Sequence, residues 1–208
     1  MNSNYSILRE QEYLEISRLE LNGEILDIGG SRKSGYHELL KGKHRITTAN
    51  INPHYECDIV FDVQKKFPIR DEQYDTVISL NVLEHIFKFE NVFLEVHRVL
   101  KKDGLFVFAV PFMFQIHGSP DDFFRYTKSA LINILSEKKF RDIEVKELGY
   151  GFFSLIAQII CGVIPTFLLK KIVNRSCCSI DKLLLRISNK YKELSMRIPL
   201  GYIVNAKK

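Results

Sequence analysis

Short apolar runs alternate along most of the chain with segments that have helical periodicity. Apolar runs of about four to eight residues predict buried strands, and apolar positions three and four residues apart predict amphipathic helices. We expect strands in residues 24–29, 44–51, 57–63, 74–80, 105–111 and 140–150. We expect helices in residues 5–21, 37–42, 90–102 and 127–138. Because strands alternate with helices, the pattern predicts a parallel α/β sheet covered by helices on both faces.

Composition adds one feature to this picture, a basic C-terminal end. The 208 residues are 46% apolar and 26% charged, which is typical of a globular protein. Residues 1–150 carry a net charge of −3, whereas residues 151–208 carry ten Lys/Arg against two acidic residues. This end favours an anionic partner, either a membrane surface or nucleic acid. The polar N-terminus and four cysteines without zinc-site spacing favour a reduced, cytoplasmic protein.

The first predicted strand runs into a glycine turn in the stretch EILDIGGSRKSG, residues 24–35. A dinucleotide fingerprint needs glycine at three positions, and this chain offers Gly29, Ser31 and Ser34 there. Asp27, directly before the turn, would repel a pyrophosphate but would suit a cationic ligand. S-adenosylmethionine carries an ammonium and a sulfonium and no phosphate. The turn therefore favours this cofactor over a dinucleotide.

Three stretches, in the right order and spacing, resemble class I S-adenosylmethionine-dependent methyltransferases of the small-molecule branch known as methyltransferase type 11. They are Asp27-x-Gly29-x-Ser31, FPIRDEQYDTVISLNVLEHI and HRVLKKDGLFVFAVP. The resemblance covers residues 24 to about 150. It implies a Rossmann-like fold with a mostly parallel seven-stranded sheet, an antiparallel last strand, and S-adenosylmethionine as the cofactor.

The resemblance also implies which residues contact the methionine part, the ribose and the adenine of the cofactor. These are Asp27, Gly29, Gly30, Ser31, Asn50, Ile51, Asp62, Val63 and Asn81. Two of them depart from the family pattern. Ser31 replaces a glycine, and Asn50 replaces the carboxylate that usually grips both ribose hydroxyls. Because an amide cannot match paired charge-assisted hydrogen bonds, we expect weaker cofactor binding than in the family.

Two histidines follow the fourth and fifth predicted strands, where a methyl acceptor should lie. We predict that His117 is the general base, with Asp121 and Tyr126 as further catalytic residues. The alternative is that their loop is simply well ordered. His85 belongs to a sequence that resembles the metal-binding E-x-x-E-H of some quinone-biosynthesis methyltransferases. Asn81 replaces the first carboxylate of that pattern, so we predict no metal site.

The loop around His117 resembles those of methyltransferases from polysaccharide and other glycan biosynthesis. We therefore expect an enzyme that methylates an oxygen of a glycan, a lipid-linked precursor or another small-molecule acceptor. One alternative is a degenerate, non-catalytic binding module, which the departures at Ser31 and Asn50 favour. A nucleic-acid methyltransferase is not expected, because the chain has no [DN]-P-P-[YF] after the fourth strand and no aromatic stacking pattern in its tail.

Residues 151–169 carry no charge, which nearly meets the length of a membrane span. PLGYIVNAK resembles the family's last strand, which returns to the same sheet, so one crossing would leave it on the wrong side of the bilayer. We expect peripheral attachment of residues 151–197 to an anionic inner membrane face, with a cover over the core or a dimer interface as the alternatives. The expected units are an N-terminal helix (1–22), a cofactor-binding core (23–150), an amphipathic helical insertion (151–197) and the last strand (198–208).

Overall fold

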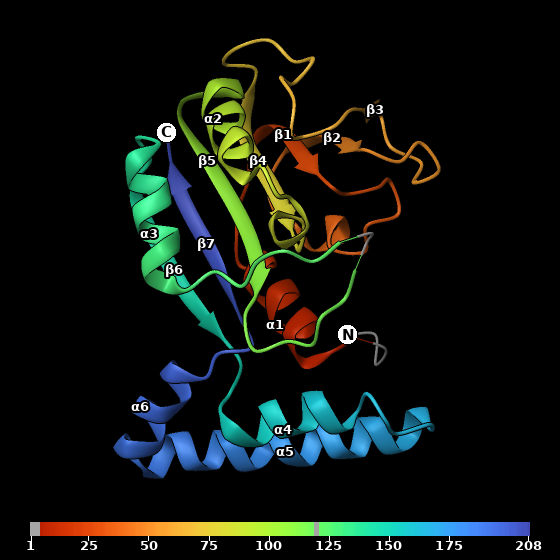
Figure 1. The fold of residues 1–208 in the computed structure, drawn as a ribbon, viewed down its shortest axis with the longest axis vertical. Helices are drawn as coiled ribbons and strands as arrows, with labels where there is room; N and C mark the ends of the chain where they lie inside the picture. Colours follow the sequence, from red (N-terminus) through yellow and green to blue (C-terminus); the bar gives the residue numbers. More distant parts are fainter. Residues whose placement is uncertain (1–4, 119–120) are drawn as a thin grey trace.

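The computed structural model describes residues 5–118 and 121–208, and their strands form one seven-stranded sheet (Figure 1). The strand order is β3-β2-β1-β4-β5-β7-β6. The strands are β1 (Gly23–Ile28), β2 (His44–Asn50), β3 (Ile59–Val60), β4 (Tyr74–Leu80), β5 (Leu100–Pro111), β6 (Arg141–Leu148) and β7 (Gly201–Lys207). β7 runs antiparallel to β5 and β6, and the other pairs are parallel. The predicted fold class, with its antiparallel last strand, is confirmed.

The helices also follow the predicted alternation. They are α1 (Ile7–Ile16), α2 (Phe89–Val99), α3 (Lys128–Glu137), α4 (Phe152–Ile160), α5 (Phe167–Ile187) and α6 (Asn189–Arg197), with 3₁₀ turns η1 (His37–Leu39) and η2 (Leu83–His85). The Thr127 hydroxyl caps α3 by accepting a hydrogen bond from the Ala130 amide at 3.2 Å. The predicted helix after β1 is only the single turn η1.

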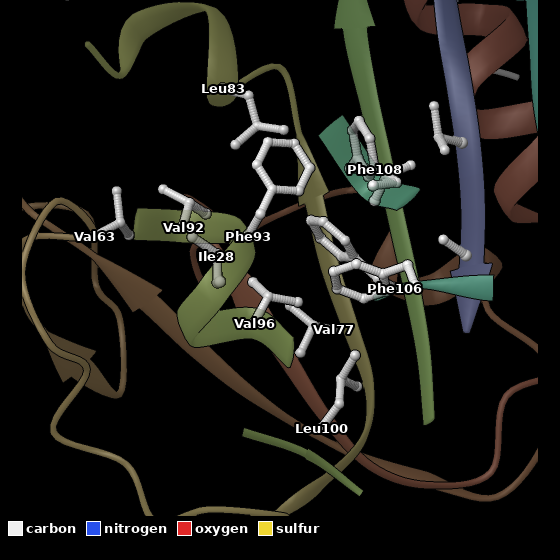
Figure 2. Packing of buried hydrophobic residues seen from close by; sticks show 14 of the residues in the cluster. Ile28, Val63, Val77, Leu83, Val92, Phe93, Val96, Leu100, Phe106 and Phe108 are labelled. Atoms are coloured by element: carbon white, nitrogen blue, oxygen red, sulfur yellow. The ribbon is translucent and has the colours of Figure 1, made fainter. Parts of the chain in front are cut away.

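The strands present alternate side chains to two apolar clusters, one on each face of the sheet. Phe106 and Phe108 of β5 belong to the cluster under α2 and α3, whereas Val107 points to the cluster on the side of α1. Figure 2 shows Phe93 of α2 lying against both phenylalanines, and its ring centroid is 6.0 and 5.8 Å from theirs. This packing fixes β4 and β5 in place, so the residues that follow them start from a rigid edge.

The insertion lies beyond the carboxyl ends of the strands, with α4 and α5 side by side (Figure 1). The buried carboxylate of Asp181 on α5 accepts hydrogen bonds from the Phe153 and Ser154 amides at 3.0 and 2.6 Å, which caps α4 from a second helix. Cys177 and Cys178 pack against the cluster on the α1 side. The insertion therefore covers part of the core. Within the described residues, no helix is both long enough and apolar enough to cross a bilayer.

Candidate functional site

Because β1, β4 and β5 are adjacent and parallel, the segments that follow them meet at one edge of the sheet. Four carboxylates with almost no solvent exposure gather there. Asp27 ends β1, Glu84 lies in η2 after β4, Asp122 follows β5, and Glu12 reaches the edge from α1. Buried carboxylates need donors or cations, so this edge is suited to a positively charged ligand.

The turn after β1 is built around the Asp27 carboxylate. His37 donates a hydrogen bond from Nε2 to Asp27 Oδ2 at 2.7 Å, whereas Oδ1 has no hydrogen-bond partner among the described residues. A Cβ atom on Gly30 would collide with this carboxylate. Gly29 has φ +83°, and a Cβ there would collide with Val82. Both glycines are therefore required for the turn to approach the end of β1 this closely.

Asn50 at the end of β2 is engaged by the same turn. Its Nδ2 donates to the carbonyl oxygens of Gly29 at 2.9 Å and Gly30 at 3.3 Å, and its Oδ1 accepts from the Asn52 amide. A carboxylate could not donate to those carbonyls, which gives a physical reason for an amide here. The turn therefore holds the Asn50 side chain, and its contact with the ribose stays a prediction. Ser31 also serves the turn, because its amide donates to Ser34 Oγ at 2.9 Å.

The residues predicted near the adenine and ribose lie at the neighbouring strand ends. Ile51 is 64% exposed and follows Asn50 directly. Asp62 follows β3, and its Oδ1 accepts from the Gln64 amide at 2.9 Å. Val63 is buried in the cluster under α2. The structure thus brings these positions to the same edge as the Asp27 turn.

Asn81 follows β4 in a left-handed conformation, with φ 54°, that asparagine tolerates better than most residues. Its Nδ2 donates to Glu12 Oε2 at 3.0 Å. Burial raises the pKa of Glu12 to about 7, and Arg9, 3.5 Å away, only partly opposes that shift. Glu12 Oε1 has no hydrogen-bond partner among the described residues. Glu12 could not be predicted as a site residue from the sequence, because a charged residue in an amphipathic helix normally lies in solvent.

Glu84 lies between two histidines. Its Oε1 is 3.7 Å from His85 Nε2 and 3.8 Å from His117 Nε2, and the two rings meet edge to face with centroids 4.9 Å apart. Neither oxygen of Glu84 has a hydrogen-bond partner among the described residues. Burial raises the pKa of Glu84 to about 8, and the charge of nearby Glu12 adds to the effect. His85 follows β4 and His117 follows β5, and the fold brings these two predicted histidines into contact.

The carboxylate beside His117 belongs to Asp122. Arg125 donates to both of its oxygens and holds the pKa of Asp122 well below the usual range. The His117 amide donates to Asp122 Oδ2 at 2.9 Å, and His117 Nδ1 lies 3.3 Å from the same oxygen. Asp121, the predicted neighbour, is exposed, and its backbone carbonyl accepts from His85 Nδ1 at 2.6 Å.

Tyr126 is buried, and its hydroxyl donates to the Leu83 carbonyl at 3.2 Å. Burial raises the pKa of the Tyr126 hydroxyl well above its ordinary value, so the hydroxyl stays protonated. This hydrogen bond ties the Tyr126 hydroxyl to η2. Of the predicted catalytic residues, His117 lies beside Glu84 and His85, Asp121 contacts His85 through its backbone carbonyl, and the Tyr126 hydroxyl contacts the Leu83 carbonyl. Their catalytic roles stay predictions.

Residues 26–108 match a family model described as a methyltransferase domain. No curated protein sequence matches the chain. Several solved methyltransferases share its fold. A methyltransferase from Mesorhizobium loti that depends on S-adenosylmethionine is 16% identical, with a TM-score of 0.59 and 100% of both chains covered. A complex of the Haloferax volcanii Trm112 activator with a putative methyltransferase gives 15% identity and a TM-score of 0.60, covering 97% of this chain and 88% of the other.

A third structure is Haemonchus contortus phosphoethanolamine N-methyltransferase 2 with phosphomonomethylethanolamine and S-adenosylhomocysteine. It is 16% identical, with a TM-score of 0.56, and the match covers 95% of this chain and 51% of that one. The present chain thus spans about half the length of that enzyme. Taken with the sheet order, these comparisons show that the chain has the fold of class I S-adenosylmethionine-dependent methyltransferases, and residues 26–108 resemble their methyltransferase domain.

Proposed function

We propose that the protein is an S-adenosylmethionine-dependent methyltransferase that methylates an oxygen of a small polar acceptor, a glycan or a lipid-linked precursor. The observation that carries this proposal is the glycine turn after β1. It buries the Asp27 carboxylate with one oxygen unpartnered among the described residues, directly beside backbone that only glycine allows. A cationic ligand without phosphates suits this arrangement, and the family match over residues 26–108 supports the same cofactor.

The residues at this edge fit the cofactor in two respects. S-adenosylmethionine, when bound, supplies a methyl group on a positively charged sulfonium next to an ammonium group. Asp27 and Glu12 offer buried negative charge, each with an oxygen that no described residue engages, and Asn81 orients Glu12 through its 3.0 Å hydrogen bond. Asp62 and Val63 would contact the adenine. Asn50 would act indirectly, by holding the carbonyls of the turn.

His117 is the residue that would take the acceptor's proton. Its Nδ1 lies 3.3 Å from both the Asp122 carboxylate and the Gln115 carbonyl, and these two acceptors hold the ring proton on Nδ1. Nε2 then keeps its lone pair on the side of Glu84. A base in this position removes the hydroxyl proton as the oxygen attacks.

Aromatic side chains beside the histidines would contact the acceptor. Phe123 and Phe87 are 44% and 62% exposed, with ring centroids 5.4 Å apart, and the Phe123 amide donates to the Glu84 carbonyl. Phe114 packs edge to face on His117 at 5.2 Å. Exposed apolar rings around a few polar groups are typical of small-molecule sites, and they would suit one face of a sugar ring or a lipid-linked headgroup.

Transfer of a labelled methyl group from S-adenosylmethionine to glycosides, nucleotide sugars and polyprenyl-linked sugars tests the proposal, with DNA and RNA as comparison acceptors. We expect transfer to one carbohydrate class. His117→Ala should lower kcat by about 10²–10⁴-fold with little change in cofactor affinity. His54→Ala, at an exposed histidine outside the site, is the matched control. Equal loss in both variants, or transfer to nucleic acid alone, would contradict the proposal.

A non-catalytic binding module is the second candidate, and the engagement of Asn50 by the turn favours it. An Asn50 amide held by two carbonyls leaves the ribose without the carboxylate that the family usually supplies. Cofactor binding without transfer to any acceptor class would support this candidate. Transfer with kcat dependent on His117 would exclude it.

The insertion supports peripheral membrane attachment near such a lipid-linked acceptor. Val163, Leu168, Leu183 and Ile187 are each more than half exposed. Exposed cations accompany them at Lys171, Arg175, Arg186 and Lys190. Apolar side chains next to cations are the combination that binds the interface of an anionic bilayer.

Liposome flotation tests this attachment. Binding should rise with anionic lipid content and fall with salt, and Lys171, Arg186 and Lys190 changed to Glu should release the protein. Lys182 is left unchanged because it lies over the Tyr150 ring at 4.5 Å. The control reverses three exposed charges outside the insertion, Lys66, Arg70 and Lys102. Equal release by both sets would contradict a role of the insertion, and so would the absence of binding to any liposome.

A further inference from the structure

Three side chains that follow the carboxyl ends of β4 and β5 carry atoms that can bind a metal ion, and these atoms lie close together. Glu84, His85 and His117 each offer one such atom, and these atoms lie within 4.8 Å of one another. The Glu84 oxygen is 3.7 and 3.8 Å from the two Nε2 atoms, which is too long for hydrogen bonds. Ligands held about 2.1 Å from one ion lie roughly 3.0–4.2 Å apart. The two distances from Glu84 therefore fall in the range of an ion's ligands, and the third pair lies within 4.8 Å.

The outer partners of both histidines direct Nε2 toward Glu84. His85 donates from Nδ1 to the Asp121 carbonyl at 2.6 Å. His117 Nδ1 lies 3.3 Å from Asp122 Oδ2, and Arg125 holds that carboxylate by donating to both of its oxygens. A ring proton fixed on Nδ1 by a carbonyl or carboxylate leaves the Nε2 lone pair free for a metal. This is the usual outer arrangement around metal-bound histidine.

Glu84 independently indicates a missing partner. Its side chain is fully buried, and neither oxygen has a hydrogen-bond partner among the described residues. A buried carboxylate in this condition is costly unless a cation or donor meets it. The side chains of His85 and His117 are 13% and 35% exposed, so an ion can enter from the His117 side.

We propose that Glu84, His85 and His117 bind one divalent transition-metal ion. Two imidazoles and a carboxylate select ions such as Zn²⁺, Co²⁺, Mn²⁺ or Fe²⁺ over Mg²⁺ and Ca²⁺. In the sequence pattern, Asn81 replaces the third ligand. In the structure, His117 from the loop after β5 is the third ligand. Binding of the ion does not depend on the proposed methyl transfer.

The role of the ion does rest on the proposed function. Three protein ligands leave coordination positions open, and an acceptor hydroxyl bound there has a lowered pKa. In the metal-bound protein the ion occupies the Nε2 lone pair of His117 and replaces the imidazole as the group that activates the hydroxyl, whose proton then leaves to solvent. His117 acts as the base only in the metal-free protein. The bond between the methyl carbon and sulfur breaks as that carbon bonds to the acceptor oxygen, and sulfur keeps the electron pair.

Titration of chelator-treated, full-length protein with Co²⁺ tests the site, because bound Co²⁺ gives a visible ligand-field absorption band. We expect one equivalent to bind and Zn²⁺ to displace it. His85→Gln and His117→Gln should each weaken binding by at least the ~10–100-fold that loss of an outer partner costs. His54→Gln is the control. No band in the wild-type protein, or the same band in all three variants, would overturn the proposal.

A second measurement needs no variant and so does not depend on variant folding. In wild-type protein labelled with ¹⁵N-histidine, Co²⁺ should shift or broaden the ring signals of His85 and His117 and leave those of His54 unchanged. Uniform or absent changes would contradict the site. Cofactor affinity of the metal-free protein is a separate readout, so failure of the methyltransferase proposal and failure of the metal proposal are distinguished.

Discussion

Replacing Glu12 with Gln should remove the part of the pH dependence of folding stability that the burial of Glu12 causes. Burial raises the pKa of Glu12 from 4.5 to about 7, so the folded state holds its proton more tightly than the unfolded chain does. At about 1.4 kcal/mol for each tenfold change in proton affinity, ionising Glu12 costs the fold about 3 kcal/mol. The cost is absent below pH 4.5, grows as pH rises, and is complete above about pH 7. The Glu12→Gln side chain keeps an oxygen that can accept from the Asn81 amide, and it carries no charge.

Urea denaturation of both proteins at several values between about pH 4.5 and 8 measures this effect. The stability of the variant relative to the wild type should increase by about 3 kcal/mol across that range. Glu84 and Arg9 face Glu12, and the charge of Glu12 also raises the pKa of Glu84, so the difference between the two proteins reports Glu12 together with its coupling to Glu84. Glu20→Gln, at an exposed position, is the control. Parallel pH profiles for wild type and Glu12→Gln would refute the reasoning.

Three further substitutions test single contacts. Gly30→Ala places a Cβ against the Asp27 carboxylate, so thermal unfolding should show a loss of about 1–3 kcal/mol in folding stability. Calorimetry should show weaker cofactor binding, and unchanged stability and affinity would contradict the turn geometry. Asn50→Asp removes two donated hydrogen bonds, each worth about 1 kcal/mol, and should weaken cofactor binding by up to about 30-fold, whereas tighter binding would favour the ribose interpretation. Tyr126→Phe leaves the Leu83 carbonyl without its donor and should cost about 1–3 kcal/mol of stability with kcat retained. A large fall in kcat would support a catalytic role for Tyr126.

The sheet could be predicted because its strands are short apolar runs between polar turns. The departures have local causes. β5 begins at Leu100 and not at residue 105, because Leu100 pairs with Tyr74 of β4 and a register shift separates this pair from Leu105. The polar residues between them hide this start in the sequence. The two-residue β3 is shorter than its apolar run, since only Ile59 and Val60 pair with β2.

The site was predictable where a single segment defines it, as in the Asp27 turn. It was not predictable where separate segments converge. Nothing local distinguishes Glu12 from a solvated helix residue, and its burial depends on the packing of α1 over the strand ends. Asp121 and Asp122 are adjacent in the sequence, and only the contacts in the structure show that Asp122 is the one that faces His117.

Calorimetric titration of the purified protein with S-adenosylhomocysteine, the demethylated cofactor, tests the central claim most directly. We predict one binding site per chain and loss of measurable binding in Asp27→Ala, with Asp121→Ala, an exposed carboxylate at the same edge, retaining the wild-type affinity. Absence of binding to the wild-type protein, or equal affinity in Asp27→Ala, would contradict the cofactor assignment.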